Sequence, residues 1–123
     1  MKVRLKRVYA PAEPGDGFRV LVDRLWPRGL ATESARIDLW LKDIAPSTEL
    51  RKWFGHDSKR WRSFRTKYFR EIGSRPDALA VLLDHVREGP VTLVYAAREE
   101  RYNDAVALNE YLSSRRKKVL TNK

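Results

Sequence analysis

Two charged turns carry most of the residues in this sequence that could do chemistry. The first is DRLWPRG at residues 23–29, which supplies Asp23, Arg24, Trp26 and Arg28. The second follows residue 97 and supplies Arg98 and then Asn103 at the start of an expected helix. Arginine binds phosphate through paired, fork-shaped donors, and a helix N-terminus adds free N–H groups and a positive dipole. These residue types suit a pocket for a phosphate or carboxylate group.

Each charged turn follows an expected buried strand. Residues 18–22, FRVLV, are mostly apolar on both faces, and residues 91–97, VTLVYAA, form a second apolar run. In open α/β sheets, ligands bind beyond the carboxyl ends of the strands. If the two strands are parallel neighbours, both turns lie on one edge. The structural alternative is that Asp23 and Arg24 pair with each other or with neighbours as a buried clamp at the strand end. Successive side chains of a strand point to opposite faces, so the two residues need not both face the pocket.

Two residues are candidates for proton chemistry. Asp23 lies among several arginines and should be ionised, which suits a base or a metal ligand more than an acid. His56 in WFGHD has a carboxylate neighbour, Asp57, and could act as a general acid or base. The alternative for this pair is that Asp57 caps the next helix and His56 is a polar turn residue. The sequence leaves open whether the protein is an enzyme.

The formal net charge of +10 indicates a second kind of partner. A basic surface attracts nucleic acid and other polyanions. The candidate nucleic-acid contacts are Lys59, Arg60, Arg62, Arg65, Lys67, Arg115 and Arg116. The expected helix that carries Lys59 to Lys67 also carries three aromatic residues, Trp61, Phe64 and Tyr68. They share one stripe, which is more typical of a core than of a base-stacking platform. A merely solvated surface and a protein partner remain alternatives, and no helix-turn-helix, Walker or zinc motif is present.

The remaining chain supplies the rest of an α/β domain. Residues 3–9 alternate as a strand, residues 10–17 and 31–36 read as loops, and residues 37–44 fit either a short strand or a helix turn. Helices are expected after the caps Ser47, Asp57 and Asn103 or Asp104, and over the apolar stripe that begins at Leu79. The predicted fold is α/β, a small, mostly parallel sheet of three to four strands with about four helices packed on it. Residues 1–112 form one domain, and residues 113–123 form a basic tail that frays.

Several stretches resemble the short, YeaO-like branch of the domain-of-unknown-function family 488. They are KRVY at residues 6–9, DGFRVLVDRLWPRGL at 16–30, WLKDIAPS at 40–47, LRKWFGHD at 50–57 and VTLVYAARE at 91–99. The resemblance implies a parallel sheet and a site at DRLWPRG, and it favours a short strand near Trp40, but it names no reaction. Longer members place a helix between the first two strands, whereas residues 10–17 are too short for one. The orientation of the first strand therefore stays open.

Composition excludes several function classes. The chain has no cysteine and two histidines, so disulfides, a cysteine nucleophile and thiolate or histidine-rich metal sites are excluded, and we expect no cofactor. No apolar run approaches the ~18 residues of a membrane span, and residues 1–9 lack the apolar core of a signal peptide. We therefore expect a cytoplasmic protein whose partner is a phosphate-bearing small molecule or a nucleic acid. The oligomeric state stays open.

Overall fold

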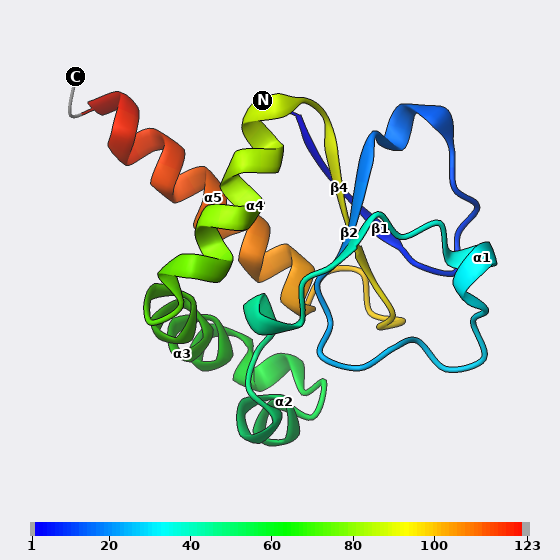
Figure 1. Ribbon diagram of the computed structural model, residues 1–123. Coiled ribbons are helices and arrows are strands. Elements are labelled where there is room, and N and C mark those ends of the chain that lie inside the picture. The colour runs from blue at the N-terminus through cyan, green and yellow to red at the C-terminus, as the bar shows by residue number, and fades with distance from the viewer. Residues whose placement is uncertain (1, 122–123) are drawn as a thin grey trace.

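The computed structural model describes residues 2–121, with side chains described for residues 2–115. Within this part of the chain, four strands form one parallel sheet and five α-helices accompany it (Figure 1). The strands are β1 (Val3–Arg7), β2 (Phe18–Leu21), β3 (Leu39–Trp40) and β4 (Val91–Tyr95). The helices are α1 (Thr32–Ala35), α2 (Thr48–Phe54), α3 (Trp61–Gly73), α4 (Pro76–Glu88) and α5 (Asp104–Thr121). The predicted α/β class is confirmed.

The strand order is β1-β4-β2-β3, and every neighbouring pair is parallel. β2 and β4 are paired from Phe18 opposite Val91 to Leu21 opposite Val94. The first strand is thus parallel, and it pairs with β4 rather than with β2. Because β2 and β4 are parallel neighbours, their carboxyl ends lie on one edge of the sheet. The prediction of one site shared by the two charged turns depended on this arrangement.

The connection from β1 to β2 is an irregular loop that a buried ion network fixes. Asp16 Oδ2 accepts from Arg19 Nη1 at 2.6 Å, and Asp16 Oδ1 accepts from Lys6 Nζ at 2.8 Å. Burial opposes the charge of Asp16, but hydrogen bonds from Lys6, the Glu13 backbone and Arg19 hold its pKa below the ordinary value. Gly17 follows with φ 65°, and a Cβ there would collide with the Pro90 carbonyl. Only glycine therefore allows the loop to enter β2 at this point.

The two faces of the sheet are covered differently. Helices α2 to α5 gather over one face (Figure 1), where Val20, Val91 and Leu93 pack into the larger core with Phe64 and other helix residues. The aromatic stripe of α3 belongs to this core, since Phe64 and Tyr68 are buried. The opposite face is covered by loops, and its small core holds Val8, Leu21 and Val94 with Trp26 and Trp40 packed against them. The loop after β2 thus has a structural role as well as a position at the sheet edge.

The predicted capping residues are engaged at the starts of α2, of the 3-10 turn Ser58–Arg60 that precedes α3, and of α5. Ser47 Oγ accepts from the Leu50 N–H at 3.1 Å, Asp57 Oδ1 accepts from the Lys59 N–H at 3.0 Å, and Asn103 Oδ1 accepts from the Val106 N–H at 2.9 Å. Among the described residues, no helix is long and apolar enough to cross a membrane. Helix α5 extends to Thr121, so it includes most of the predicted basic tail. The fraying of that tail and the boundary at residue 112 stay predictions.

Two local predictions are corrected or resolved by the structure. Residues 31–36 are not a plain loop, because Ser34 and Ala35 N–H groups donate to the Ala31 carbonyl and form the single turn of α1. This turn has no side-chain cap and ends at Arg36 in the left-handed region, with φ 52°. Residues 37–44 divide into the two-residue strand β3 and a 3-10 turn at Lys42–Ile44, so both interpretations apply to different parts of the segment.

Candidate functional site

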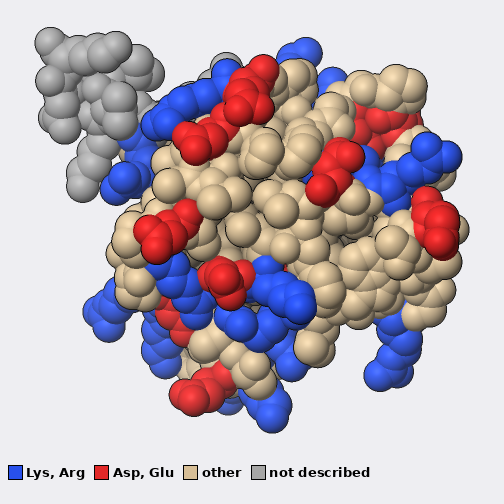
Figure 2. Space-filling model, viewed as in Figure 1, with Lys and Arg blue, Asp and Glu red and all other residues tan. Residues whose placement is uncertain are grey.

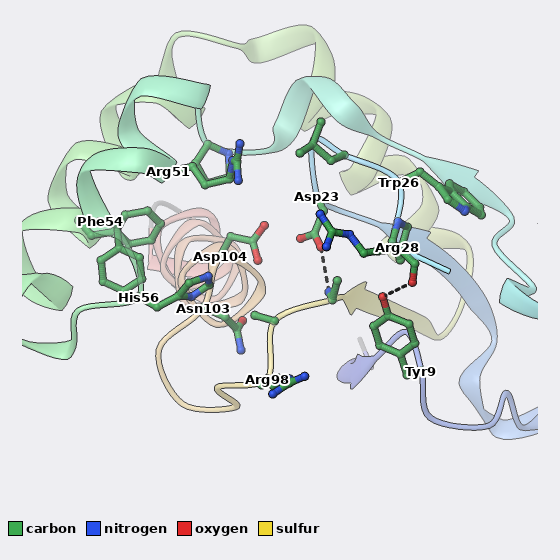
Figure 3. Close-up of a pocket in the computed structure, with 16 residues that line it drawn as sticks. Tyr9, Asp23, Trp26, Arg28, Arg51, Phe54, His56, Arg98, Asn103 and Asp104 are labelled. Atoms are coloured by element: carbon green, nitrogen blue, oxygen red, sulfur yellow. Dashed lines mark hydrogen bonds between the residues drawn. The ribbon is translucent and has the colours of Figure 1, made fainter. Parts of the chain in front are cut away.

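A cavity of about 600 Å³ lies at the carboxyl ends of β2 and β4 (Figure 3). Its walls come from the loop after β2, from α2 and the turn after it, and from the segment that joins β4 to α5. The apolar part of the lining consists of Leu25, Trp26, Pro27, Pro46, Phe54, Phe64, Ala96 and Ala97. The polar and charged part consists of Tyr9, Asp23, Arg28, Arg51, His56, Arg98, Asn103 and Asp104. The two predicted charged turns therefore meet in one cavity.

Asp23 is fixed at the end of the paired strands. The N–H of Val22 still donates to the Val94 carbonyl at 3.2 Å, and Asp23 Oδ2 then accepts the N–H of Ala96 at 2.8 Å. The indole N–H of Trp40 donates to the backbone carbonyl of Asp23 at 2.8 Å. These bonds hold the carboxyl group at the cavity as an acceptor that spans the ends of β2 and β4.

Asp104 is the second carboxyl group of the cavity. It is the first residue of α5, is half-buried, and accepts the N–H of Ala105 on Oδ1 at 2.9 Å. Figure 3 shows its carboxyl group facing that of Asp23. Burial, and then the charge and hydrogen bonding of Asp23, raise the pKa of Asp104 well above the ordinary value. Asp104 therefore retains its proton at a pH where a solvated carboxyl group would be ionised.

Sequence reasoning treated Asp104 only as a possible helix cap. The available signal was its place in the turn after a buried strand, next to Asn103, on the edge that Asp23 also occupies. Among the described residues, no group of three His, Cys, Asp or Glu side chains is arranged to hold a metal ion. The Asp23–Asp104 pair is a hydrogen-bonding feature of the cavity, since Asp23 accepts the Ala96 N–H and Asp104 accepts the Ala105 N–H.

Three exposed arginines border the same cavity. Arg28 follows β2, Arg51 lies on α2, and Arg98 follows β4. Figure 3 shows them on different sides of the Asp23–Asp104 pair. In the part of the chain whose side chains are described, none of the three forms an ion pair. Sequence reasoning missed Arg51, because its spacing fits the polar face of an amphipathic helix and only the fold brings that face to the cavity.

His56 lies at the exposed edge of the cavity. Gly55 and His56 both adopt left-handed backbone angles, with φ 54° and 58°, and this turn ends α2. The ring of His56 lies 6.2 Å from that of Phe54, centroid to centroid. In the described contacts, Asp57 forms no hydrogen bond or ion pair with His56. Its carboxylate accepts the Lys59 N–H and lies 3.8 Å from Arg60 Nε. Asp57 is a capping residue, as its alternative interpretation predicted, but it caps the 3-10 turn Ser58–Arg60 that precedes α3 rather than α3 itself. Catalysis by His56 stays a prediction.

Trp26 and Asn103 line the cavity while their polar groups are engaged elsewhere. Trp26 Nε1 donates to the Leu30 carbonyl at 2.7 Å and its ring packs edge-on against Trp40. Asn103 is 3 % exposed, donates to the Glu99 carbonyl at 2.8 Å and caps α5. Both residues therefore shape the wall, and Trp26 contributes an apolar surface to the cavity.

Arg24 is not among the residues that line the cavity, which differs from its predicted place in the ligand pocket. Its Nε donates to the Pro46 carbonyl at 3.1 Å and its Nη2 to the Ala45 carbonyl at 3.2 Å. The physical reason is the alternation of the chain after β2, which directs Asp23 and Arg24 to different surroundings. The guanidinium holds the segment before α2 against the loop after β2, as the structural alternative expected.

The residues predicted to contact nucleic acid are partly engaged within the protein. Arg65 forms a 3.1 Å ion pair with Glu110, and Lys67 Nζ lies 3.7 Å from the ring centroid of Trp53, which Arg60 also approaches. Lys59, Arg62 and Arg115 are exposed, and Arg116 lies outside the residues whose side chains are described. Figure 2 shows Lys and Arg side chains over the region of α2 and α3, with Asp and Glu interspersed on the same face. This surface is basic but not of a single sign.

The fold and cavity define a small α/β protein with a pocket at the ends of two parallel strands. A family model described as "Inactive DUF488-N3 subclade" matches residues 2–122, and the chain belongs to this DUF488 subclade. The chain is 42% identical over 114 residues to "Uncharacterized protein YeaO" of Escherichia coli, covering 93% of this chain and 99% of the relative. It is 40% identical over 114 residues to "Uncharacterized protein Rv3073c" of Mycobacterium tuberculosis, covering 93% and 96%. No solved structure matches the chain significantly.

Proposed function

We propose that this protein binds a small, phosphate-bearing ligand of the nucleotide type in the cavity at the ends of β2 and β4. The observation that carries this proposal is the meeting of Arg28, Arg51 and Arg98 around one cavity without ion-pair partners in the described part of the chain. An arginine that serves the fold is normally engaged, as Arg19 and Arg24 are. Exposed guanidiniums that gather around a cavity are available to an anion.

The size and lining of the cavity support a ligand larger than inorganic phosphate. Its volume of about 600 Å³ falls within the ~300–1,000 Å³ typical of small-molecule sites. Trp26, Phe54 and Phe64 give it aromatic walls, which suit a flat heterocycle. A nucleotide combines such a heterocycle with a phosphate group, and it would use both the walls and the arginines.

Binding without turnover is the form of this function that we favour. The family model carries the word "Inactive" in its description. Asp23 and His56 both line the cavity, yet His56 is exposed and Asp57 is committed to capping the following 3-10 turn. Catalytic roles for Asp23 and His56 remain hypotheses within this proposal. The cytoplasmic location expected from the sequence is likewise part of the proposal.

Nucleic-acid binding through the surface of α3 is the second candidate. It is supported by the net charge of +10 and by the exposure of Lys59, Arg62 and Arg115. It is weakened by the ion pair of Arg65 with Glu110. A backbone-reading surface loses affinity steeply with salt, whereas a pocket that encloses its ligand retains more of it.

The test is a thermal-shift screen at low and moderate salt. The panel holds nucleoside monophosphates, nucleosides, sugar phosphates, inorganic phosphate and short oligonucleotides. We expect stabilisation by one small phosphate compound, largely retained at moderate salt and lost in the Arg28→Ala and Arg51→Ala variants. Arg62→Ala is the matched control, because Arg62 is exposed on α3 and does not line the cavity. The opposite result would be that every polyanion stabilises the protein and that this stabilisation disappears at moderate salt and in Arg62→Ala. That result would contradict the pocket and favour the second candidate.

A further inference from the structure

The Asp23–Asp104 pair indicates which phosphate compounds the cavity accepts. We propose that the cavity selects ligands with a single phosphate at the arginines and a neutral or cationic hydrogen-bonding head at the Asp23 and Asp104 carboxyl groups, as in a nucleoside monophosphate. This inference rests on the proposed function and adds the chemical class of the ligand. It follows from the way charge is distributed within the cavity.

The cavity has an acidic interior and a basic border. Asp23 and Asp104 are half-buried, whereas Arg28, Arg51 and Arg98 are exposed. Figure 3 shows the two carboxyl groups facing each other, with Arg51 and Arg98 on opposite sides of the pair and Arg28 beside Asp23. A ligand that enters therefore meets guanidiniums first and carboxyl groups farther in. A phosphate that went to the carboxyl groups would be repelled, so the phosphate stays at the border and the other end of the ligand faces the pair.

The carboxyl pair offers both a donor and several acceptors. Each residue already accepts one backbone N–H, from Ala96 at Asp23 and from Ala105 at Asp104. Their remaining oxygens are directed toward each other and toward the cavity. A pair that holds one proton can donate one hydrogen bond and accept others, which matches the polar edge of a base or the hydroxyl groups of a sugar.

The other titratable groups near Asp23 and Asp104 do not remove the preference of this carboxyl pair for a neutral or cationic group. Tyr68 of α3 is buried and donates its hydroxyl to the Ile44 carbonyl at 2.6 Å. Arg51 and His56 face the cavity from α2 and the turn after it, and both are exposed. No described cation forms an ion pair with Asp23 or Asp104. A second anionic group on the ligand would therefore meet the carboxyl pair directly.

Isothermal titration calorimetry at constant pH and salt tests this selection. The probes are the 5′-monophosphates of adenosine, guanosine, cytidine and uridine, and fructose 1,6-bisphosphate as a compound with an anion at each end. They are titrated into the wild type, into Asp23→Asn and Asp104→Asn, and into the double variant. Asparagine retains an oxygen for the N–H groups of Ala96 and Ala105, so the variants keep these bonds. Asp84→Asn is the matched control, because Asp84 is exposed on α4 and pairs only with Arg87 in the described contacts.

We expect the wild type to bind at least one monophosphate more than about tenfold tighter than the bisphosphate, because like charges in contact cost several kcal/mol. In the double variant this preference should fall to less than about threefold, and Asp84→Asn should keep it. Equal binding of both compounds by the wild type, or an unchanged preference in the double variant, would overturn the inference while leaving a phosphate pocket. Binding of none of the probes, with no stabilisation by any phosphate compound in the screen, would overturn the proposed function itself.

Discussion

Replacing Asp104 by asparagine should stabilise the protein at neutral pH, which is unusual for a residue at a helix start. Burial and the nearby Asp23 carboxylate raise the pKa of Asp104, so the folded state binds a proton that the unfolded state releases. Below the ordinary carboxyl pKa of about 3.9, the folded and unfolded states bind the same number of protons at this group. Between that pH and the raised pKa of the folded state, the free energy of unfolding falls as pH rises.

The size of the effect follows from proton linkage. Within the window between the two pKa values, the slope approaches about 1.4 kcal/mol per pH unit. The asparagine side chain of the variant does not titrate, so the variant should escape this loss and its advantage should grow at that slope. The helix dipole adds no cost within this window, because Asp104 at the start of α5 is protonated in the folded state and asparagine removes no charge there. Asparagine still accepts the Ala105 N–H, so no backbone donor is left unpaired.

Urea unfolding at a series of pH values from about 3.5 to 8 measures this difference directly. We expect Asp104→Asn to equal or fall slightly below the wild type at the acidic end and to exceed it at the neutral end. Asp84→Asn should show no such trend, since Asp84 is an exposed partner of Arg87. An Asp104→Asn variant that is less stable than the wild type at every pH would refute the reasoning, because Asp104 would then act as an ordinary favourable helix cap.

Three further predictions concern charged and polar groups that the fold uses. Arg24→Ala should lower the free energy of unfolding by about 2–4 kcal/mol, because two charged hydrogen bonds to backbone carbonyls are lost, whereas the exposed Arg62→Ala should change it by less than about 0.5 kcal/mol. Equal effects in urea unfolding would contradict a structural Arg24. Arg19→Met should cost about 3–5 kcal/mol by leaving the buried carboxylate of Asp16 with one partner fewer; a loss under about 1 kcal/mol in thermal unfolding would show that the network is dispensable. Tyr68→Phe should cost about 1–3 kcal/mol, because a buried carbonyl loses its donor, and an unchanged melting temperature would argue against that bond.

The two strands at the site could be predicted because their signals are local, whereas their parallel pairing was a condition that only the structure established. Phe18 to Val22 and Val91 to Tyr95 are continuous apolar runs, and each is followed by a charged turn. The helix caps Ser47 and Asp57 could be read in the same way, because a cap depends on a side chain and an N–H two or three residues away. These predictions needed no knowledge of the tertiary fold.

The residues that line the site could be predicted only in part, because the lining depends on contacts between segments that are distant in the sequence. Arg24 was expected in the pocket but serves the backbone before α2, and the sequence cannot show which way a residue turns once a strand has ended. Arg51 and Asp104 looked like ordinary helix residues, and only the packing of α2 and α5 against the sheet edge brings them to Asp23. The turn of α1 was missed because it lacks a side-chain cap.

The most direct test of the proposed pocket is an NMR titration of ¹⁵N-labelled protein with a nucleoside monophosphate. The cavity supplies separate reporters, since the Ala96 amide is bonded to Asp23 and the Trp26 indole N–H lies in the loop after β2. We predict that saturable shift changes concentrate at these groups and at Arg98. Shift changes confined to the surface of α3 around Lys59 and Arg62, or none at millimolar ligand, would contradict a ligand pocket at the ends of β2 and β4.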